Sequence, residues 1–134
     1  MIEVIVVMAI FSALVGMSAF FDLTFYRGSS FNSDYDVFIA VLQRSRARAV
    51  NNINGSKHGL YIDSDKYILF QGDDYATATA AEEISRNPDI SYTGAVEVVF
   101  NQLSGDSSFG GKIVLSDGFK TATVSFNNEG QIDW

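Results

Sequence analysis

The most continuous apolar stretch of the chain is its first 21 residues, MIEVIVVMAIFSALVGMSAFF, which carry no charge between Glu3 and Asp22. A helix of about 21 residues rises roughly 32 Å, enough to cross a hydrocarbon layer about 30 Å thick. Such a helix is apolar on all sides and has no face suited to water. The pattern predicts a hydrophobic helix surrounded either by lipid or by identical helices at the dry centre of an assembly.

One carboxylate, that of Glu3, lies near the start of this stretch, where removal from water is costly unless a positive group lies beside it. Arg27 is the first basic residue, so the nearest positive group is the N-terminal amine of the same chain or of a neighbouring copy. The alternative is a plain membrane anchor whose Glu3 lies among lipid headgroups. A secretory signal peptide has basic residues first and a small-residue cleavage site last, and because this stretch has neither, we expect it to be retained.

The residues after Arg27 favour a break in the helix. Gly28, Ser29 and Ser30 begin the sequence GSSFNS. Glycine loses much backbone entropy in a helix, and serine competes for backbone hydrogen bonds. We therefore predict a break in the helix. The segment between the two helical halves covers residues 28–33, and the interruption itself is expected near residues 28–32.

A second helical pattern follows this break. Ser33 is a suitable N-cap, with Asp34 and Asp36 in the first turn, where the helix dipole favours negative charge. Apolar residues then recur at helical spacing, which predicts a helix over residues 34–52. The alternative is one continuous helix of about 50 residues with no break.

Short apolar runs separated by turn residues fill the rest of the chain. The expected strands cover residues 59–63, 66–71, one or two segments within 90–101, 112–115, 121–126 and 131–134. Ser64-Asp65 and Asp117-Gly118 predict the turns of two hairpins. Residues 80–86 predict one or two helical turns that end before Pro88.

Together these elements predict an α+β fold: a long N-terminal hydrophobic helix, interrupted near residues 28–32, followed by a small antiparallel β-sheet domain. One apolar face of the sheet should pack on the C-terminal half of the helix, because a sheet of this size cannot bury its own face. The predicted boundaries are 1–27 for the hydrophobic helix, 28–33 for the break, 34–52 for the second half of the helix and 53–134 for the β domain.

The amino-acid composition argues against several classes of function. The chain has 134 residues, no cysteine and a net charge of −7, so no disulfide framework or thiol chemistry is available. Acidic charge argues against broad nucleic-acid binding. Arg44 and Arg48 share a helix face while Arg46 points about 200° away, and no aromatic residues interleave with them, so a solvated helix end is favoured over a DNA-binding surface.

Candidate catalytic and metal-binding groups are sparse. His58 is the only histidine, and we interpret it as an exposed turn residue. No nucleophile has a histidine partner and no glycine-rich phosphate loop is present, so enzyme activity is not expected. The aspartates of the turns do not have the spacing of an EF-hand loop, and no metal or other cofactor is expected.

The stretch IEVIVVMAIFSALVGM resembles the N-terminal helix of type IV pilins and of the pseudopilins of type II secretion. Mature chains of that family usually begin Phe-Thr-Leu-Ile-Glu-Val, and Ile2, Glu3 and Val4 match the last three of these residues. Later segments, VVFNQLSGD, KIVLSD and ATVSFNNEGQIDW, are similar in rhythm to the C-terminal sheet of GspH/FimT-type members. The resemblance implies the pilin fold.

Three departures from the family pattern are present. Met1 stands two residues before Glu3, where the family usually has four. Many major pilins carry a proline about 17 residues after the glutamate, and here that position is Phe20. The cysteines that bound a disulfide loop in many major pilins are also absent.

The resemblance implies a structural subunit of a type IV pilus-like helical filament that polymerises through its N-terminal helix. Glu3 is then expected to pair with the N-terminal amine of a neighbouring Met1. Seven apolar side chains of the helix are expected to pack between neighbours: Val4, Ile5, Val7, Met8, Phe11, Leu14 and Val15. The implied partners are other copies of the chain, the inner-membrane pilus assembly machinery and, before assembly, membrane lipid, while DNA is not expected.

The implied location is an extracellular filament on the cell surface, with the cytoplasmic membrane as the location before assembly. Adhesion, motility and secretion are all compatible with such a filament. Two alternatives remain open at this point. One is a minor pilin or type II secretion pseudopilin that primes a fibre or sits at its tip. The other is a monomeric, membrane-anchored binding domain.

Overall fold

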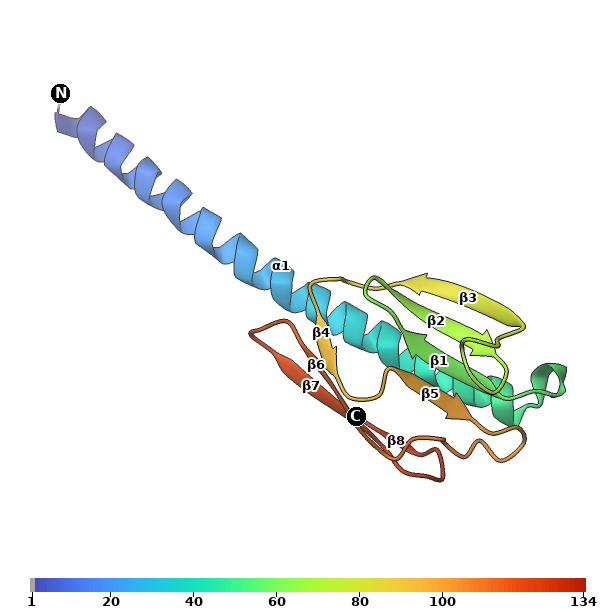
Figure 1. Ribbon diagram of the computed structural model, residues 1–134. Coiled ribbons are helices and arrows are strands. Elements are labelled where there is room, and N and C mark those ends of the chain that lie inside the picture. The colour runs from blue at the N-terminus through green and yellow to red at the C-terminus, as the bar shows by residue number, and fades with distance from the viewer. Residues whose placement is uncertain (1) are drawn as a thin grey trace.

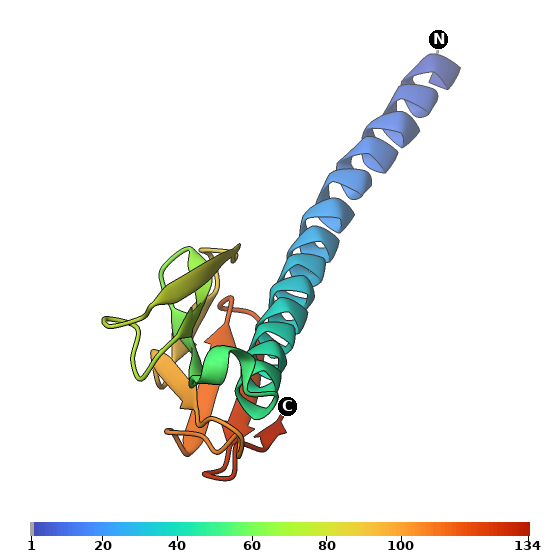
Figure 2. The same ribbon diagram turned by 90° about the vertical axis from the view of Figure 1, so that its right-hand side faces the viewer.

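The computed structural model describes the backbone of residues 2–134 and the side chains of residues 2–17 and 29–134. One α-helix, α1 (Ile2–Val50), forms the first part of the chain. Its first half extends away from the rest of the molecule, and its second half lies against the strands (Figures 1 and 2). The described core residues of α1 therefore come from its second half, beginning at Phe31.

The predicted break in the helix is wrong. Gly28, Ser29 and Ser30 all lie inside α1, which runs from Ile2 to Val50 as one helix. Phe31 is buried directly after them, and the hydroxyl of Ser30 accepts a hydrogen bond of 3.0 Å from the side-chain amide of Asn87. Contacts with the body of the molecule thus stabilise the helical backbone here. They outweigh the unfavourable helix propensities of glycine and serine, which amount to at most about 1 kcal/mol per residue.

The long hydrophobic helix predicted for residues 1–27 is also corrected. Across the described residues, no helix combines the length and the apolarity that crossing a membrane requires.

The strands form two four-stranded antiparallel sheets, whereas one sheet was predicted. The first sheet has the order β3-β2-β1-β5 and the second β4-β6-β7-β8. The strands are β1 (His58–Ile62), β2 (Lys66–Gln71), β3 (Ala80–Ser85), β4 (Ser91–Thr93), β5 (Glu97–Phe100), β6 (Gly111–Ser116), β7 (Thr121–Phe126) and β8 (Ile132–Asp133). A short 3₁₀ helix, η1 (Ile53–Gly55), joins α1 to β1.

Residues 80–86 were predicted to form helical turns, and this is wrong because residues 80–85 form strand β3. This strand pairs with β2, with Leu69 opposite Glu82 and Lys66 opposite Ser85. Its partly buried residues alternate with exposed ones, as on a sheet edge. Hydrogen bonding to the edge of β2 therefore outweighs the local preference of this segment for a helix.

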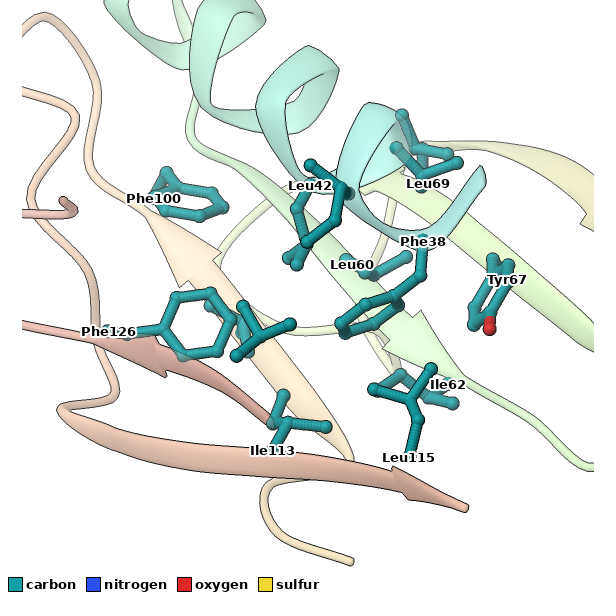
Figure 3. Close-up of a cluster of buried hydrophobic side chains, with 14 of the residues drawn as sticks. Phe38, Leu42, Leu60, Ile62, Tyr67, Leu69, Phe100, Ile113, Leu115 and Phe126 are labelled. Atoms are coloured by element: carbon teal, nitrogen blue, oxygen red, sulfur yellow. The ribbon is translucent and has the colours of Figure 1, made fainter. Parts of the chain in front are cut away.

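The core lies between α1 and the two sheets. Phe38 and Leu42 project from α1 towards Leu60 of β1 and Phe100 of β5 (Figure 3). Ile113 and other side chains of the second sheet close the cluster from the far side (Figure 3). The buried helical residues recur every three or four positions, which presents one apolar stripe to the sheets.

Asn51 and Asn52 end the helix. Asn52 adopts the left-handed conformation with φ 54°, which asparagine tolerates better than most residues. Its backbone N–H donates to the carbonyl oxygen of Ala49 at 3.0 Å. This turn sends the chain back along the helix into β1, so the first sheet packs on α1.

Candidate assembly surface

Residues 2–17 of α1, here named the apolar segment, expose large hydrophobic side chains on every side of the helix. Eleven of them are between 52% and 76% exposed. They are Ile2, Val4, Ile5, Val6, Val7, Met8, Ile10, Phe11, Leu14, Val15 and Met17. Soluble monomers rarely expose a continuous apolar surface of this kind, which marks a site of interaction.

The seven apolar residues predicted to pack between neighbours, Val4 to Val15, all lie exposed on this segment. The prediction for Met1 lies outside the described residues. Sequence reasoning left out Ile2, Val6, Ile10 and Met17, although the all-round apolarity of the stretch already pointed to them. The apolar surface therefore extends around the whole circumference of the helix and is not confined to one face.

Glu3 lies in the first turn of α1, where a carboxylate is favoured by the helix dipole. Its side chain is exposed, and among the described residues no ion pair to it is found. A contact that buried the apolar segment would remove this carboxylate from water. Such a contact therefore has to supply a positive group at Glu3.

Where α1 enters the body of the molecule, a buried polar network holds it. Asp34, predicted to be an acidic residue of a helix start, is buried and accepts a hydrogen bond of 2.7 Å from the hydroxyl of Tyr67. The backbone N–H of Asn87 donates to its other oxygen at 3.0 Å. These bonds tie α1 to β2 and to the segment after β3.

Arg86 extends this network between the two sheets. Its guanidinium donates to the carbonyl oxygen of Asp63 at 2.7 Å and to that of Ile90. It also lies over the ring of Tyr92 of β4, 4.8 Å from the centroid, and over that of Tyr67, at 5.7 Å. Burial, and then the hydrogen bond to Asp34, raise the pKa of Tyr67 above its ordinary value. Its hydroxyl therefore stays protonated and donating at neutral pH.

The three arginines near the end of α1 have different surroundings. Arg44 and Arg48 each form an ion pair of 2.6 Å with Glu82 on β3. The hydrogen bond from Arg48, followed by that from Arg44, lowers the pKa of the Glu82 carboxyl. Arg46 points to the other side of the helix, and Glu82 does not pair with it.

His58 is not the exposed turn residue that we predicted. It is buried in β1, and its ring Nε2 lies 3.0 Å from the carbonyl oxygen of Ile53. A carbonyl oxygen only accepts, so this nitrogen donates. Among the described residues, no group of three His, Asp or Glu side chains is arranged to hold a metal ion. His58 serves the fold at the end of α1.

Comparison of the chain with protein-family models, with curated protein sequences and with solved structures found no match. The apolar segment is thus interpreted from its own geometry and chemistry.

Proposed function

We propose that the chain is the structural subunit of a type IV pilus-like helical filament and that it polymerises through the apolar segment of α1. The observation that carries the proposal is the exposure of eleven large hydrophobic side chains around the whole circumference of residues 2–17. The likeness of Ile2-Glu3-Val4 to the start of mature pilins supports it further. In this proposal the filament is extracellular and lies on the cell surface.

The all-round exposure favours identical copies as the partner. A groove on another protein covers one side of a helix, whereas a bundle of like helices covers all sides of each member. Every copy brings the same apolar surface, so repeated addition buries it without a second component. Each buried aliphatic side chain contributes roughly 1.5–3 kcal/mol before losses of entropy.

Glu3 gives the bundle a register. The carboxylate is the one charge on the apolar segment, and a bundle that pairs it with a positive group avoids leaving a charge unpaired in a dry environment. The resemblance to pilins points to the N-terminal amine of a neighbouring copy as that group. A helix shifted along its neighbour loses this pair, so one stagger between copies is preferred.

The proposal is tested by placing a charge within the apolar segment. Phe11→Glu and Met8→Glu each put a carboxylate where neighbours are expected to meet, and we expect both to abolish fibres. Purified full-length chain is examined by negative-stain electron microscopy and by pelleting in an ultracentrifuge. Asn32→Glu is the matched control, because Asn32 is an exposed polar residue of the same helix beyond the segment.

Fibres of unchanged abundance in Phe11→Glu and Met8→Glu would refute the proposal. So would a purified chain that stays a single subunit at all concentrations with its apolar segment covered by detergent or lipid alone. Abundant fibres made of this chain alone indicate a major subunit. Glu3→Ala tests the register separately, and we expect fewer or irregular fibres with the body still folded.

A further inference from the structure

A groove on the body of the molecule lies far along α1 from the apolar segment. It runs between the last turns of α1 and the end of the chain beside β8, and its volume is about 520 Å³. Residues on both walls include Gln43, Arg46, Val50, Asn51, Gln131 and Trp134. This volume falls within the range of small-molecule binding sites.

Arg46 is the charged side chain that lines this groove. Glu82 holds the two neighbouring arginines of the helix, Arg44 and Arg48, in ion pairs of 2.6 Å. Within the part of the chain that the structure describes, Arg46 has no ion pair, and its Nε is buried without a hydrogen-bond partner. The loops at Gly105 and Gly130 lie against Nε, whereas Arg46 as a whole is only partly buried and lines the groove. An acceptor in the groove therefore meets the terminal nitrogens of the guanidinium.

Two loops hold Arg46 in place. A Cβ on Gly130 would collide with the carbonyl oxygen of Gly105 and lie 3.2 Å from Nε of Arg46, and Gly130 has φ +72°. A Cβ on Gly105, which has φ +72°, would collide with Cγ2 of Val50 at 2.5 Å and lie 3.5 Å from Nε of Arg46. Glycine is thus required where the loops approach each other and the arginine stem. These close approaches limit the space around the stem of Arg46.

The remaining groups of the groove suit a sugar ring. Trp134 is 62% exposed, and with Val50 it offers an apolar wall beside the charge. The side-chain amides of Gln43 and Asn51 are exposed, and amides both donate and accept hydrogen bonds. A pyranose has one face of C–H groups and a rim of hydroxyl groups, which match an aromatic ring and amides respectively.

We propose that this groove binds an acidic saccharide, with the sugar ring on Trp134 and its carboxylate on Arg46. The planar guanidinium matches a carboxylate and distinguishes it from a neutral hydroxyl group. This proposal is independent of filament formation, since it involves a different surface of the chain.

The net charge of −7 opposes binding of an anion at long range. Charges are screened over about 8 Å at physiological ionic strength, so the groups within the groove decide the binding. Asp133 precedes Trp134 in sequence, but the groove walls do not include it. Among the side chains that line the groove, Arg46 is the one that carries a charge.

The single tryptophan makes the groove directly observable, because all indole fluorescence comes from Trp134. Full-length chain is titrated with tri-galacturonic acid and, separately, with the neutral galactose trisaccharide. We expect a saturable change in fluorescence with the acidic sugar and binding about tenfold weaker or more with the neutral one. Equal binding of both sugars, or no saturable change up to about 10 mM acidic sugar, would overturn the proposal.

Variants test whether Arg46 supplies the positive charge that binds the acidic sugar. Arg46→Gln should weaken binding of the acidic sugar by about tenfold or more. Arg44→Gln, two residues earlier on the opposite side of the helix and outside the groove, should leave binding unchanged. Gln43→Glu adds a repelling carboxylate at an exposed position, so it tests the groove without touching the buried side of the helix. We expect it to weaken the acidic sugar and spare the neutral one, with Asn32→Glu as its control. Inorganic phosphate producing the same saturable signal as the sugar would reduce the site to a simple anion site and contradict the proposal.

Discussion

Asp34 is a buried carboxylate on a helix face whose neighbours are large apolar side chains. The hydroxyl of Tyr67 and the backbone N–H of Asn87 together satisfy it, at 2.7 and 3.0 Å. Neither partner lies near Asp34 in sequence, so the sequence alone suggested a solvated residue of a helix start. Removing the partners of a buried carboxylate of this kind costs several kcal/mol.

Tyr67 makes the stability of the fold depend on alkaline pH. Its pKa is raised by burial and by Asp34, so the unfolded chain releases the phenolic proton at a lower pH than the folded chain does. We expect the contribution of Tyr67 to the free energy of unfolding to be constant below about pH 10 and to be lost as pH rises beyond it. Urea unfolding measured at pH 7 to 11 for the native chain and Tyr67→Phe checks this.

The Tyr67→Phe variant should be less stable by about 1–3 kcal/mol at neutral pH, because Asp34 loses a donor, and its decline above pH 10 should be shallower. Tyr61→Phe is the control, since that ring stacks on Tyr75 at 4.3 Å and does not contact Asp34. An identical alkaline slope in the native chain and Tyr67→Phe would contradict the interpretation.

The conformation of strand β3 depends on its contacts with β2 and α1. Glu82 and Glu83 face arginines of α1 and Lys66 of β2, so the charges of this edge strand are matched from two sides. The alanines and glutamates of the segment favour a helix locally, yet the pairing along β2 and these ion pairs favour a strand. Charged side chains on an edge strand also discourage pairing with the edge of another molecule.

Replacing Glu82 by Gln tests this matching. Because the pair is largely exposed, we expect the stability to fall by about 0.2–1 kcal/mol at pH 7. The lowered pKa of Glu82 means that its contribution exists above the ordinary carboxyl pKa and disappears as pH falls through the folded value. Urea unfolding should therefore show a larger difference between native and variant chains at pH 7 than at pH 3.

Hairpins were predictable from the sequence because their signals are local. Ser64-Asp65 and Asp117-Gly118 lie at the turns between β1 and β2 and between β6 and β7. The continuous course of α1 through Gly28 was only the alternative prediction. Local preferences oppose it by about 1 kcal/mol per residue, and packing of Phe31 on strands distant in sequence outweighs them. His58 was misjudged for the same reason, since its acceptor at Ile53 depends on how the chain turns after the helix.

The molecule as a whole joins an acidic body to an uncharged, apolar helix end. Without Glu3 the net charge of −7 becomes −6, so nearly all of the excess charge lies beyond the apolar segment. In the proposed filament the segments attract while the bodies repel. Assembly is then a balance between burial of apolar surface and repulsion of like charges.

This balance predicts how salt acts on assembly. Raising the ionic strength from about 0.01 to 0.15 M shortens the screening length from about 30 to 8 Å and weakens repulsion between bodies. We expect the concentration at which fibres first form, measured by sedimentation, to fall with added salt. A rise would show that ion pairs between copies outweigh repulsion. The Phe11→Glu variant should form no fibres at either ionic strength.

The unbroken course of α1 through Gly28 bears on how such a fibre would carry tension. The segment proposed to contact neighbouring copies and the residues that anchor the body belong to one helix. A pull on the body therefore loads backbone hydrogen bonds in series along the helix axis. Lengthening requires the helix itself to unwind, from about 1.5 to about 3.3 Å per residue, before the body has to open. A subunit built in this way is stiff under small forces and yields by uncoiling under large ones.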